Sequence, residues 1–157
     1  MAVTHLLDQR KEIVRRLHED LLSNGKLDLL GEIIADDYVG ADGRVGISPF
    51  LETIRDLRVG FPDILWTVDD LVAEGDLVAV RWTWEGTHTG TMRLFPSTGK
   101  RVTNAGYAIY QFRDDKIVRV WMLTDRLGFV QQIGVVPSDL RLLRQSQPAK
   151  ALENKVA

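Results

Sequence analysis

The sequence predicts a single α+β domain in which N-terminal helices cover one face of a curved antiparallel sheet and enclose a pocket. Residues 1–60 repeat apolar side chains at three- and four-residue steps, which is typical of amphipathic helices. Residues 63–123 instead form long β-rich runs separated by tight turns, which is typical of an antiparallel meander. Because helices are few, they must cover one sheet face while the sheet curls around a cavity.

Three helices are expected before the sheet. The first carries its apolar stripe over residues 6–22 and ends at an Asn-Gly pair, which tolerates the left-handed conformation of a C-terminal cap. The second spans about 27–34 and leads through Tyr38 into a glycine-rich loop. The third starts at Ser48, where a hydroxyl cap precedes a proline in the first turn, and ends at Gly60.

The strands are expected at 63–74, 76–93, 101–113 and from 117 to about 123, followed by a short helix over 126–134. The last strand is apolar on both parities, which predicts a strand covered on both faces. Alternation places on one face Ile117, Arg119, Trp121, Leu123 and Asp125. The carboxylate of Asp125 therefore lies at the end of the face that carries the indole of Trp121. Burying this charge costs free energy unless a partner or a reaction requires it.

Residues 1–136 are predicted to form the single domain, and 137–157 a polar tail. A chain of 157 residues is long enough to bury a core without staples. The absence of cysteine excludes a disulfide framework, thiolate nucleophiles and Cys-ligated metal.

The net charge and the absence of long apolar segments limit the kinds of binding partner that we expect. The net charge of −2 with mixed signs gives no reason to expect nucleic acid. The start of the chain lacks a basic segment followed by an apolar block, and no apolar run could span a bilayer. We therefore expect a cytoplasmic protein that contacts no membrane. Scattered histidines (His5, His18 and His88) and the lack of a phosphate-binding loop after a strand predict no metal and no cofactor.

The second strand carries the most informative face. Its even positions include Trp82 and Trp84 and lead to His88, which could line a cavity. The alternative that the indoles are core or cover a subunit interface is favoured, because aromatic residues fill cores more often than sites. On the third strand, Asn104 shares its parity with small residues that leave room for a ligand or for a neighbour's side chains. The candidate pocket residues are Trp82, Trp84, Asn104, Trp121, Phe61 and Tyr38.

The chain resembles the SnoaL-like polyketide and ester cyclases in an ordered series of segments: FPDILWTVDDLVAEGDLVAVRW, GTHTG, PSTGKRV, DDKIVRVWMLTD and QQIG. This resemblance runs from the first helix to Gly134. It implies the cystatin-like cone of the nuclear transport factor 2 type, a deep hydrophobic pocket and a polyketide-like small-molecule substrate. It also implies cofactor-free aldol cyclisation, with Asp125 matching the catalytic aspartate and His88 the pocket histidine.

The chemistry of such a ring closure fits these two side chains. An aldol closure removes a proton from a carbon flanked by carbonyls and then protonates the new alkoxide. A carboxyl kept out of water can do both, which gives Asp125 the role of acid and base. His88 would donate a hydrogen bond to the enolate or carbonyl oxygen. Alternatively, Asp125 caps the helix that follows it.

Two other functions stay open. One is another acid/base enzyme of the same fold, an epoxide hydrolase or an isomerase. An epoxide hydrolase would need a second carboxylate near Asp125, and only Glu85 or Asp63 could supply it. The other is a binding or assembly module that holds a ligand without turnover, which a capping-only role for Asp125 would favour.

Oligomerisation through the sheet is also expected, as a dimer or tetramer. The resemblance implies it, and strand alternation supports it. The outward parities carry Trp66, Arg81, Thr83 and Tyr107, a surface too apolar in parts to stay wet.

Overall fold

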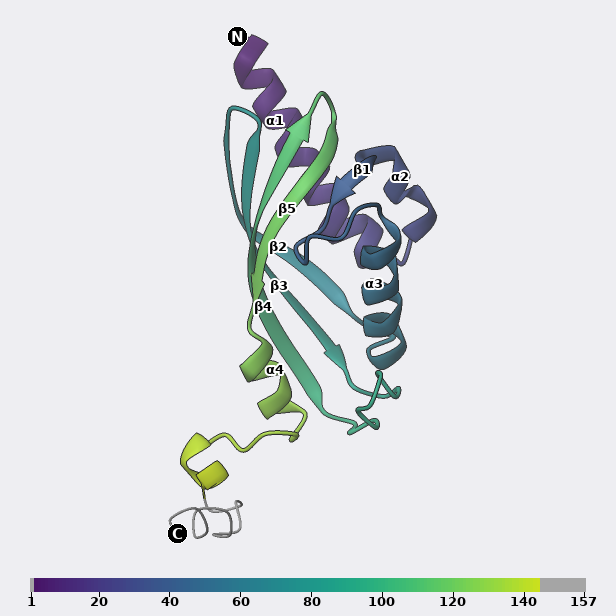
Figure 1. Cartoon of the computed structure of the whole chain (residues 1–157), viewed down its shortest axis with the longest axis vertical. Coiled ribbons are helices and arrows are strands. Elements are labelled where there is room, and N and C mark those ends of the chain that lie inside the picture. The colour runs from purple at the N-terminus through teal and green to yellow at the C-terminus, as the bar shows by residue number, and fades with distance from the viewer. Residues whose placement is uncertain (1, 145–157) are drawn as a thin grey trace, which may run out of the picture.

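The computed structural model describes residues 2–144 and has the predicted α+β cone: helices on one side of a curved, unclosed sheet (Figure 1). Five strands are hydrogen-bonded in the order β1-β5-β4-β3-β2. The strands are β1 (Ile34–Val39), β2 (Leu65–Glu74), β3 (Leu77–Thr87), β4 (Arg101–Arg113) and β5 (Lys116–Thr124). The helices are α1 (Ala2–Arg15), the π-helical η1 (Arg16–Leu22), the 3-10 turn η2 (Leu27–Leu29), α2 (Leu30–Ile33), α3 (Ser48–Gly60), α4 (Arg126–Gln132) and the 3-10 turn η3 (Leu140–Arg144).

The core lies between the helices and the inner face of β3 and β4. Both strands alternate buried and exposed residues along their length, as their sequences predict. The antiparallel register sets Trp82 opposite Gly106 and Trp84 opposite Asn104, all on the inner face. A Cβ at Gly106 would overlap the six-membered ring of Trp82, so the missing side chain makes room for the indole.

β1 is a strand that the sequence analysis missed. It follows α2 directly and pairs in parallel with β5, Ile34 standing opposite Ile117. The predicted antiparallel meander is confirmed for β2 to β5, and the fifth strand, which was not predicted, makes the sheet mixed. The segment is short, carries Asp36 and Asp37 at its centre, and gains its hydrogen bonds from a strand far along the chain. No local pattern reports such pairing.

The boundaries of the helices largely agree with the predictions. The first predicted helix is α1 continued by η1, and Gly25 adopts the expected left-handed conformation with φ +68°. α3 begins at Ser48 itself, so this serine is the first helical residue and the predicted hydroxyl cap is wrong. Residues 145–157 of the predicted polar tail lie outside the described residues, and the division into domain and tail stays a prediction.

A bulge in β5 changes which side chains face the core. After Ile117 the pairing with β4 slips by one residue, so the alternation reverses there. Ile117 and Val120 are both buried, whereas Trp121 is 47% and Leu123 79% exposed on the outer face. The prediction that Ile117 and Trp121 share a face is wrong. Within the described chain only the inner face of β5 is covered, so the predicted cover of the outer face stays a prediction.

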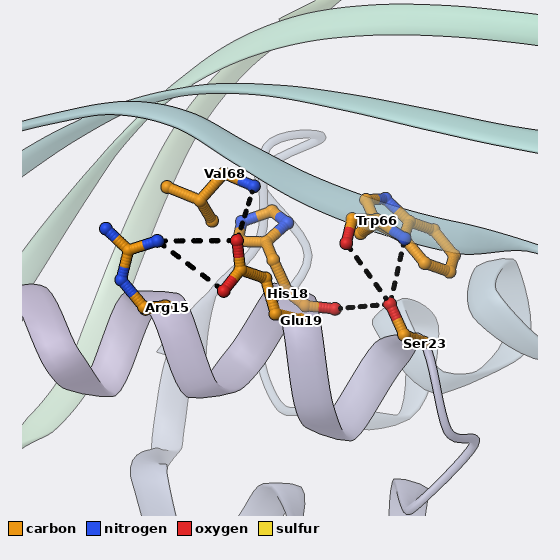
Figure 2. Close-up of polar contacts among 6 residues, drawn as sticks. All are labelled: Arg15, His18, Glu19, Ser23, Trp66 and Val68. Carbon is orange, nitrogen blue, oxygen red and sulfur yellow. Dashed lines mark hydrogen bonds and ion pairs between the residues drawn. The ribbon is translucent and has the colours of Figure 1, made fainter.

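η1 docks against the free edge of β2, as Figure 2 shows. The Ser23 hydroxyl accepts a hydrogen bond from the amide of Trp66 at 2.8 Å, and Glu19 Oε1 accepts one from the amide of Val68 at 2.9 Å. Two side chains from the helical segment thus replace the strand that β2 lacks on this edge. Trp66, which was predicted to point outward, is buried here, because it stands opposite Trp84 and cross-strand partners share a face.

Arg10 fastens the other end of this helical segment. Its guanidinium donates to the carbonyl of Gly75 at 2.7 Å and to that of Asp114 at 3.2 Å. These residues form the β2–β3 and β4–β5 turns, so α1 is tied to both hairpins. α1 and η1 therefore hold a fixed position over the inner face.

The Ser23 bond can be tested by Ser23→Ala. We expect this change to lower the free energy of unfolding by about 1–3 kcal/mol, because it leaves the buried amide of Trp66 without a partner. Thr53→Ala is the matched control, since Thr53 donates its hydroxyl to the Pro49 carbonyl on an exposed helix face. Urea unfolding of the two variants measures the difference, and equal losses would contradict the docking.

Candidate functional site

His88 lies just beyond the end of β3 and is completely buried. Its ring stacks on Phe61 with centroids 4.9 Å apart, and its Nδ1 lies 3.1 Å from the hydroxyl oxygen of Thr98. The backbone is held as firmly. The His88 amide donates to the Lys100 carbonyl at 2.8 Å, and its carbonyl accepts the amides of Thr98 and Gly99 at 3.1 and 2.8 Å. The imidazole therefore has a fixed orientation.

The other ring nitrogen of His88, Nε2, is buried and has no hydrogen-bond partner within the described chain. Burial lowers the pKa of His88, so the ring is neutral at neutral pH. A buried polar atom without a partner costs free energy unless water or a ligand pairs with it. His88 Nε2 is therefore a candidate contact for a ligand atom.

Four of the predicted pocket residues come together on the inner face. Phe61 packs against Trp84 with ring centroids 5.1 Å apart, and Phe129 of α4 lies 6.0 Å from Phe61 and 6.2 Å from Trp84. Trp82 precedes Trp84 by two residues on the same face, and Asn104 stands opposite Trp84. The site is thus a line of aromatic rings with an amide beside it, ending at His88.

The other two predicted pocket residues lie apart from this line. Tyr38, on β1, is buried with its ring at 6.4 Å from that of Phe50, and burial raises its pKa. Trp121 points outward, where the guanidinium of Arg119 lies 5.6 Å from its ring. The β5 bulge keeps Trp121 from joining the inner-face residues.

Asp125 is the N-terminal cap of α4. Its Oδ1 accepts a hydrogen bond from the amide of Gly128 at 2.8 Å, and its own amide donates to the Ala105 carbonyl of β4 at 3.1 Å. A Cβ at Gly128 would overlap the Asp125 carboxylate, so glycine is needed for this cap. The capping alternative is confirmed. The side chain is exposed, so the expectation that this carboxyl is kept out of water is wrong, and its role in acid/base chemistry stays a proposal.

α4 holds Asp125 at the end of the sheet. The side-chain amide of Gln132 accepts from the Thr103 amide at 3.0 Å and donates to the Thr103 carbonyl at 2.8 Å, as a neighbouring strand would. α4 thus takes over the edge of β4 where β5 stops. From the same helix, Phe129 reaches the aromatic line.

The two carboxylates that could have formed a site with Asp125 make hydrogen bonds or ion pairs with other residues. Asp63 accepts the amide and the hydroxyl of Thr87 at 2.7 and 2.8 Å, which lowers its pKa. Glu85 pairs with Arg101 at 2.7 Å. The second carboxylate that an epoxide hydrolase would need is therefore not supplied by either residue. Among residues 2–144, no group of three His, Asp or Glu side chains could hold a metal ion.

A second buried histidine, His18 on η1, was missed as a site residue. Its Nε2 lies 3.0 Å from the Tyr110 hydroxyl, and its ring stacks on Trp82 with centroids 5.9 Å apart. His18 Nδ1 and Trp82 Nε1 are both buried without a partner in the described part of the chain. The apolar stripe could have revealed it, because His18 lies four residues after Val14 and three before Leu21, which are fully buried.

One surface depression, of about 440 Å³, lies elsewhere, between α1 and β2. It is lined by Asp8, Lys11, Glu12, Arg15, Asp69, Asp70 and Leu71, and so by none of the predicted pocket residues. The deep hydrophobic pocket implied by the resemblance stays a prediction.

The sequence model for SnoaL-like polyketide cyclases matches residues 12–133. This chain belongs to the SnoaL-like polyketide cyclase family. A candidate polyketide cyclase from Acidithiobacillus ferrooxidans is 30% identical, with a TM-score of 0.71 over 80% of this chain and 94% of its own. IdmH from Streptomyces antibioticus, also a candidate polyketide cyclase, is 28% identical, with a TM-score of 0.70 over 80% of this chain and 99% of its own.

Other comparisons bear on the fold alone or find nothing. AclR from Streptomyces galilaeus, a candidate hydroxylase, is 22% identical with a TM-score of 0.76 over 88% of this SnoaL-like chain and 89% of its own. At that identity the likeness shows a shared cone. No curated protein matches the chain. Within the described residues, no helix is long and apolar enough to cross a membrane.

The buried His18 makes stability depend on pH. Burial lowers its pKa from 6.5 to about 3, so between these values the unfolded chain binds a proton that the folded chain does not. Stability should therefore fall as pH drops below 6.5, with His18 contributing up to about 1.4 kcal/mol per pH unit. The free energy of unfolding, measured with urea between about pH 7 and pH 5, should change less steeply with pH in His18→Gln than in the native protein. His5→Gln, on the exposed face of α1, should keep the full slope, and an unchanged slope in His18→Gln would contradict the burial argument.

Proposed function

We propose that this chain is a cofactor-independent cyclase that closes a ring in a polyketide-like substrate by acid/base chemistry. The observation that carries the proposal is the buried Nε2 of His88, which has no partner within the described residues and lies at the end of the aromatic line. Flat rings suit a polycyclic ligand, and a polar nitrogen among them suits its oxygen atoms. Membership of the SnoaL-like family supports the same reaction class.

The proposed reaction is an intramolecular aldol closure. A proton leaves a carbon between two carbonyls, that carbon bonds to a second carbonyl carbon, and the resulting alkoxide takes up a proton. No atom is lost and no electron carrier is needed. Neutral His88 would hold the enolate or carbonyl oxygen through an Nε2–H donor. Asp125 would remove and return the proton. Its cap bond engages Oδ1, which leaves Oδ2 to exchange the proton.

Phe129 offers a way for a substrate to reach His88. It is a partly exposed member of the aromatic line and comes from α4, a helix of seven residues. A small movement of α4 would carry both Phe129 and Asp125, so opening the aromatic line and placing the carboxylate would be one event. The substrate would then stack where Phe129 packs against Phe61 and Trp84.

A second candidate function is a module that binds the same ligand without turnover. The observation that favours it is the exposed, capping position of Asp125. The two functions share the inner-face residues and differ in whether the native protein turns the ligand over. Where it does, one substitution tests whether Asp125 exchanges the proton.

That substitution is Asp125→Asn. Asparagine caps a helix nearly as well as aspartate, so the melting temperature should stay unchanged. Turnover of a polycyclic substrate bearing a β-keto ester side chain should fall by about 10²–10⁴-fold, because the amide cannot exchange the proton. Asp8→Asn, on the exposed face of α1, is the matched control and should retain full turnover.

The outcomes of His88→Gln complete this test. Loss of turnover in both His88→Gln and Asp125→Asn supports the cyclase with both residues in the site. Retained turnover in Asp125→Asn alone would move the proton transfer to His88. Tight binding without turnover in the native protein would establish the binding module instead.

We further propose that the protein is a homodimer through the outer face of the sheet. The apolar patch on this face consists of Tyr107, Ile109, Trp121 and Leu123, all exposed and contributed by β4 and β5. Cross-strand pairing sets Tyr107 beside Leu123 and Ile109 beside Trp121, so the patch is continuous. A second copy would bury it.

Sedimentation at micromolar concentration should give twice the monomer mass of 17.7 kDa. Trp121→Glu should shift the protein toward the monomer, because it buries a charge in the interface. Val72→Glu, which changes an apolar residue of β2 that is 68% exposed and outside this patch, should stay dimeric. A monomeric native protein would refute the dimer.

A further inference from the structure

The segment that carries His18 has an unusual backbone. η1 is π-helical over Arg16–Leu22, and the His18 carbonyl accepts the amide of Ser23, five residues on, at 3.3 Å. π-helical segments are rare and occur frequently at functional sites. This one turns a histidine toward the inner face of the sheet, where it contacts Trp82 and Tyr110.

His18 is held in place by two residues that follow it in the chain, Glu19 and Ser23 (Figure 2). Glu19 is bonded to the amide of Val68, and Ser23 to that of Trp66. The Ser23 hydroxyl also donates to the His18 carbonyl at 3.0 Å. The edge of β2 therefore fixes the position of the ring before any ligand arrives, as binding sites require.

The Tyr110 hydroxyl sets the tautomer of His18. The phenol is buried, burial raises its pKa, and its hydrogen needs an acceptor. We assign this role to His18 Nε2, whose distance of 3.0 Å from the hydroxyl oxygen suits either direction of the hydrogen bond. The ring proton of the neutral imidazole is then on Nδ1, the nitrogen that has no partner among the described residues. His18 thus presents an N–H donor.

Trp82 supplies a second unpaired donor, on a ring that stacks against that of His18. An indole Nε1–H can only donate, and this one is buried without an acceptor in the described chain. The indole lies across Gly106 and against His18, with the two ring planes inclined by 26°. The two buried donors lack the same kind of partner, an acceptor that brings no hydrogen of its own.

We propose that His18, Trp82 and Tyr110 form a subsite for a carbonyl oxygen of a flat polycyclic ligand, which accepts hydrogen bonds from Trp82 Nε1 and His18 Nδ1. A carbonyl or enolate oxygen has two lone pairs and no hydrogen, so it satisfies both donors. The subsite rests on the proposed function for the class of ligand only. It is separate from His88, which lies further along the chain past the end of β3 and contacts Phe61 and Thr98.

Two ligands of the same shape test this subsite: anthraquinone-2-sulfonate and anthracene-2-sulfonate. They share the three-ring frame and the sulfonate, and only the first has carbonyl oxygens. Calorimetric titration of the full chain should show about tenfold or stronger preference for the quinone, since its oxygens pair donors that otherwise stay unsatisfied. Equal affinities, or binding of neither ligand, would overturn the proposal.

Substitution of Trp82 tests whether the preference for the quinone comes from its indole N–H. Trp82→Phe keeps a ring and removes the donor, so it should lower quinone affinity about tenfold and leave anthracene affinity unchanged. Trp66→Phe, which changes a buried tryptophan of β2 outside the subsite and the aromatic line, is the matched control, and its ratio of the two affinities should equal that of the native protein. Equal ratios in native protein and Trp82→Phe would overturn the assignment.

A measurement on the native chain guards against a variant that does not fold. Long-range ¹⁵N–¹H correlation spectra should show His18 as the neutral Nδ1–H tautomer, and its Nδ1 resonance should move when the quinone is added. The opposite tautomer, or an unmoved resonance at saturation, would contradict the subsite. Because none of these readouts needs turnover, an inactive protein that prefers the quinone would refute the cyclase proposal and leave the subsite intact.

Discussion

The free edge of β2 is the constraint on which the rest of the inner face depends. An edge strand with unpaired amides must be covered, and here the cover is a helical segment that bonds through Ser23 and Glu19. These contacts fix the rotation of η1 about its own axis, and that rotation aims His18 at the sheet. Arg10 ties the same helix to both hairpin turns. The position of the buried histidine is thus a consequence of how the sheet ends.

The inner face itself combines large rings with small neighbours. β3 carries Trp82 and Trp84, while β4 leaves space with Gly106. This complementarity buries indoles and imidazoles deeply and supplies few polar groups to pair with them. Ring nitrogens at both ends of the line stay unsatisfied within the described chain. Such groups destabilise a fold unless water or a ligand pairs with them, and we propose that a ligand pairs with them when it binds.

Local pattern predicts the elements whose hydrogen bonds and burial are local. Strict alternation was enough to place Trp82, Trp84 and Asn104 on the inner face, and residue order was enough to make Asp125 a helix cap. The features it missed depend on distant partners. The pairing of β1 with β5, the bulge that turns Trp121 outward and the π-helical turn that aims His18 inward are all set by tertiary contacts. Sequence therefore indicated the candidate residues around His88 and overlooked those around His18.

The most direct test of this account is a crystal structure of the protein with anthraquinone-2-sulfonate. We predict the ligand on the inner face, with a quinone oxygen about 2.7–3.2 Å from Trp82 Nε1 and in reach of His18 Nδ1. Phe129 should be displaced from its present contact with Phe61. A ligand bound only on the outer face, with the inner-face nitrogens bonded to ordered water, would contradict the claim that these nitrogens exist to bind a carbonyl compound.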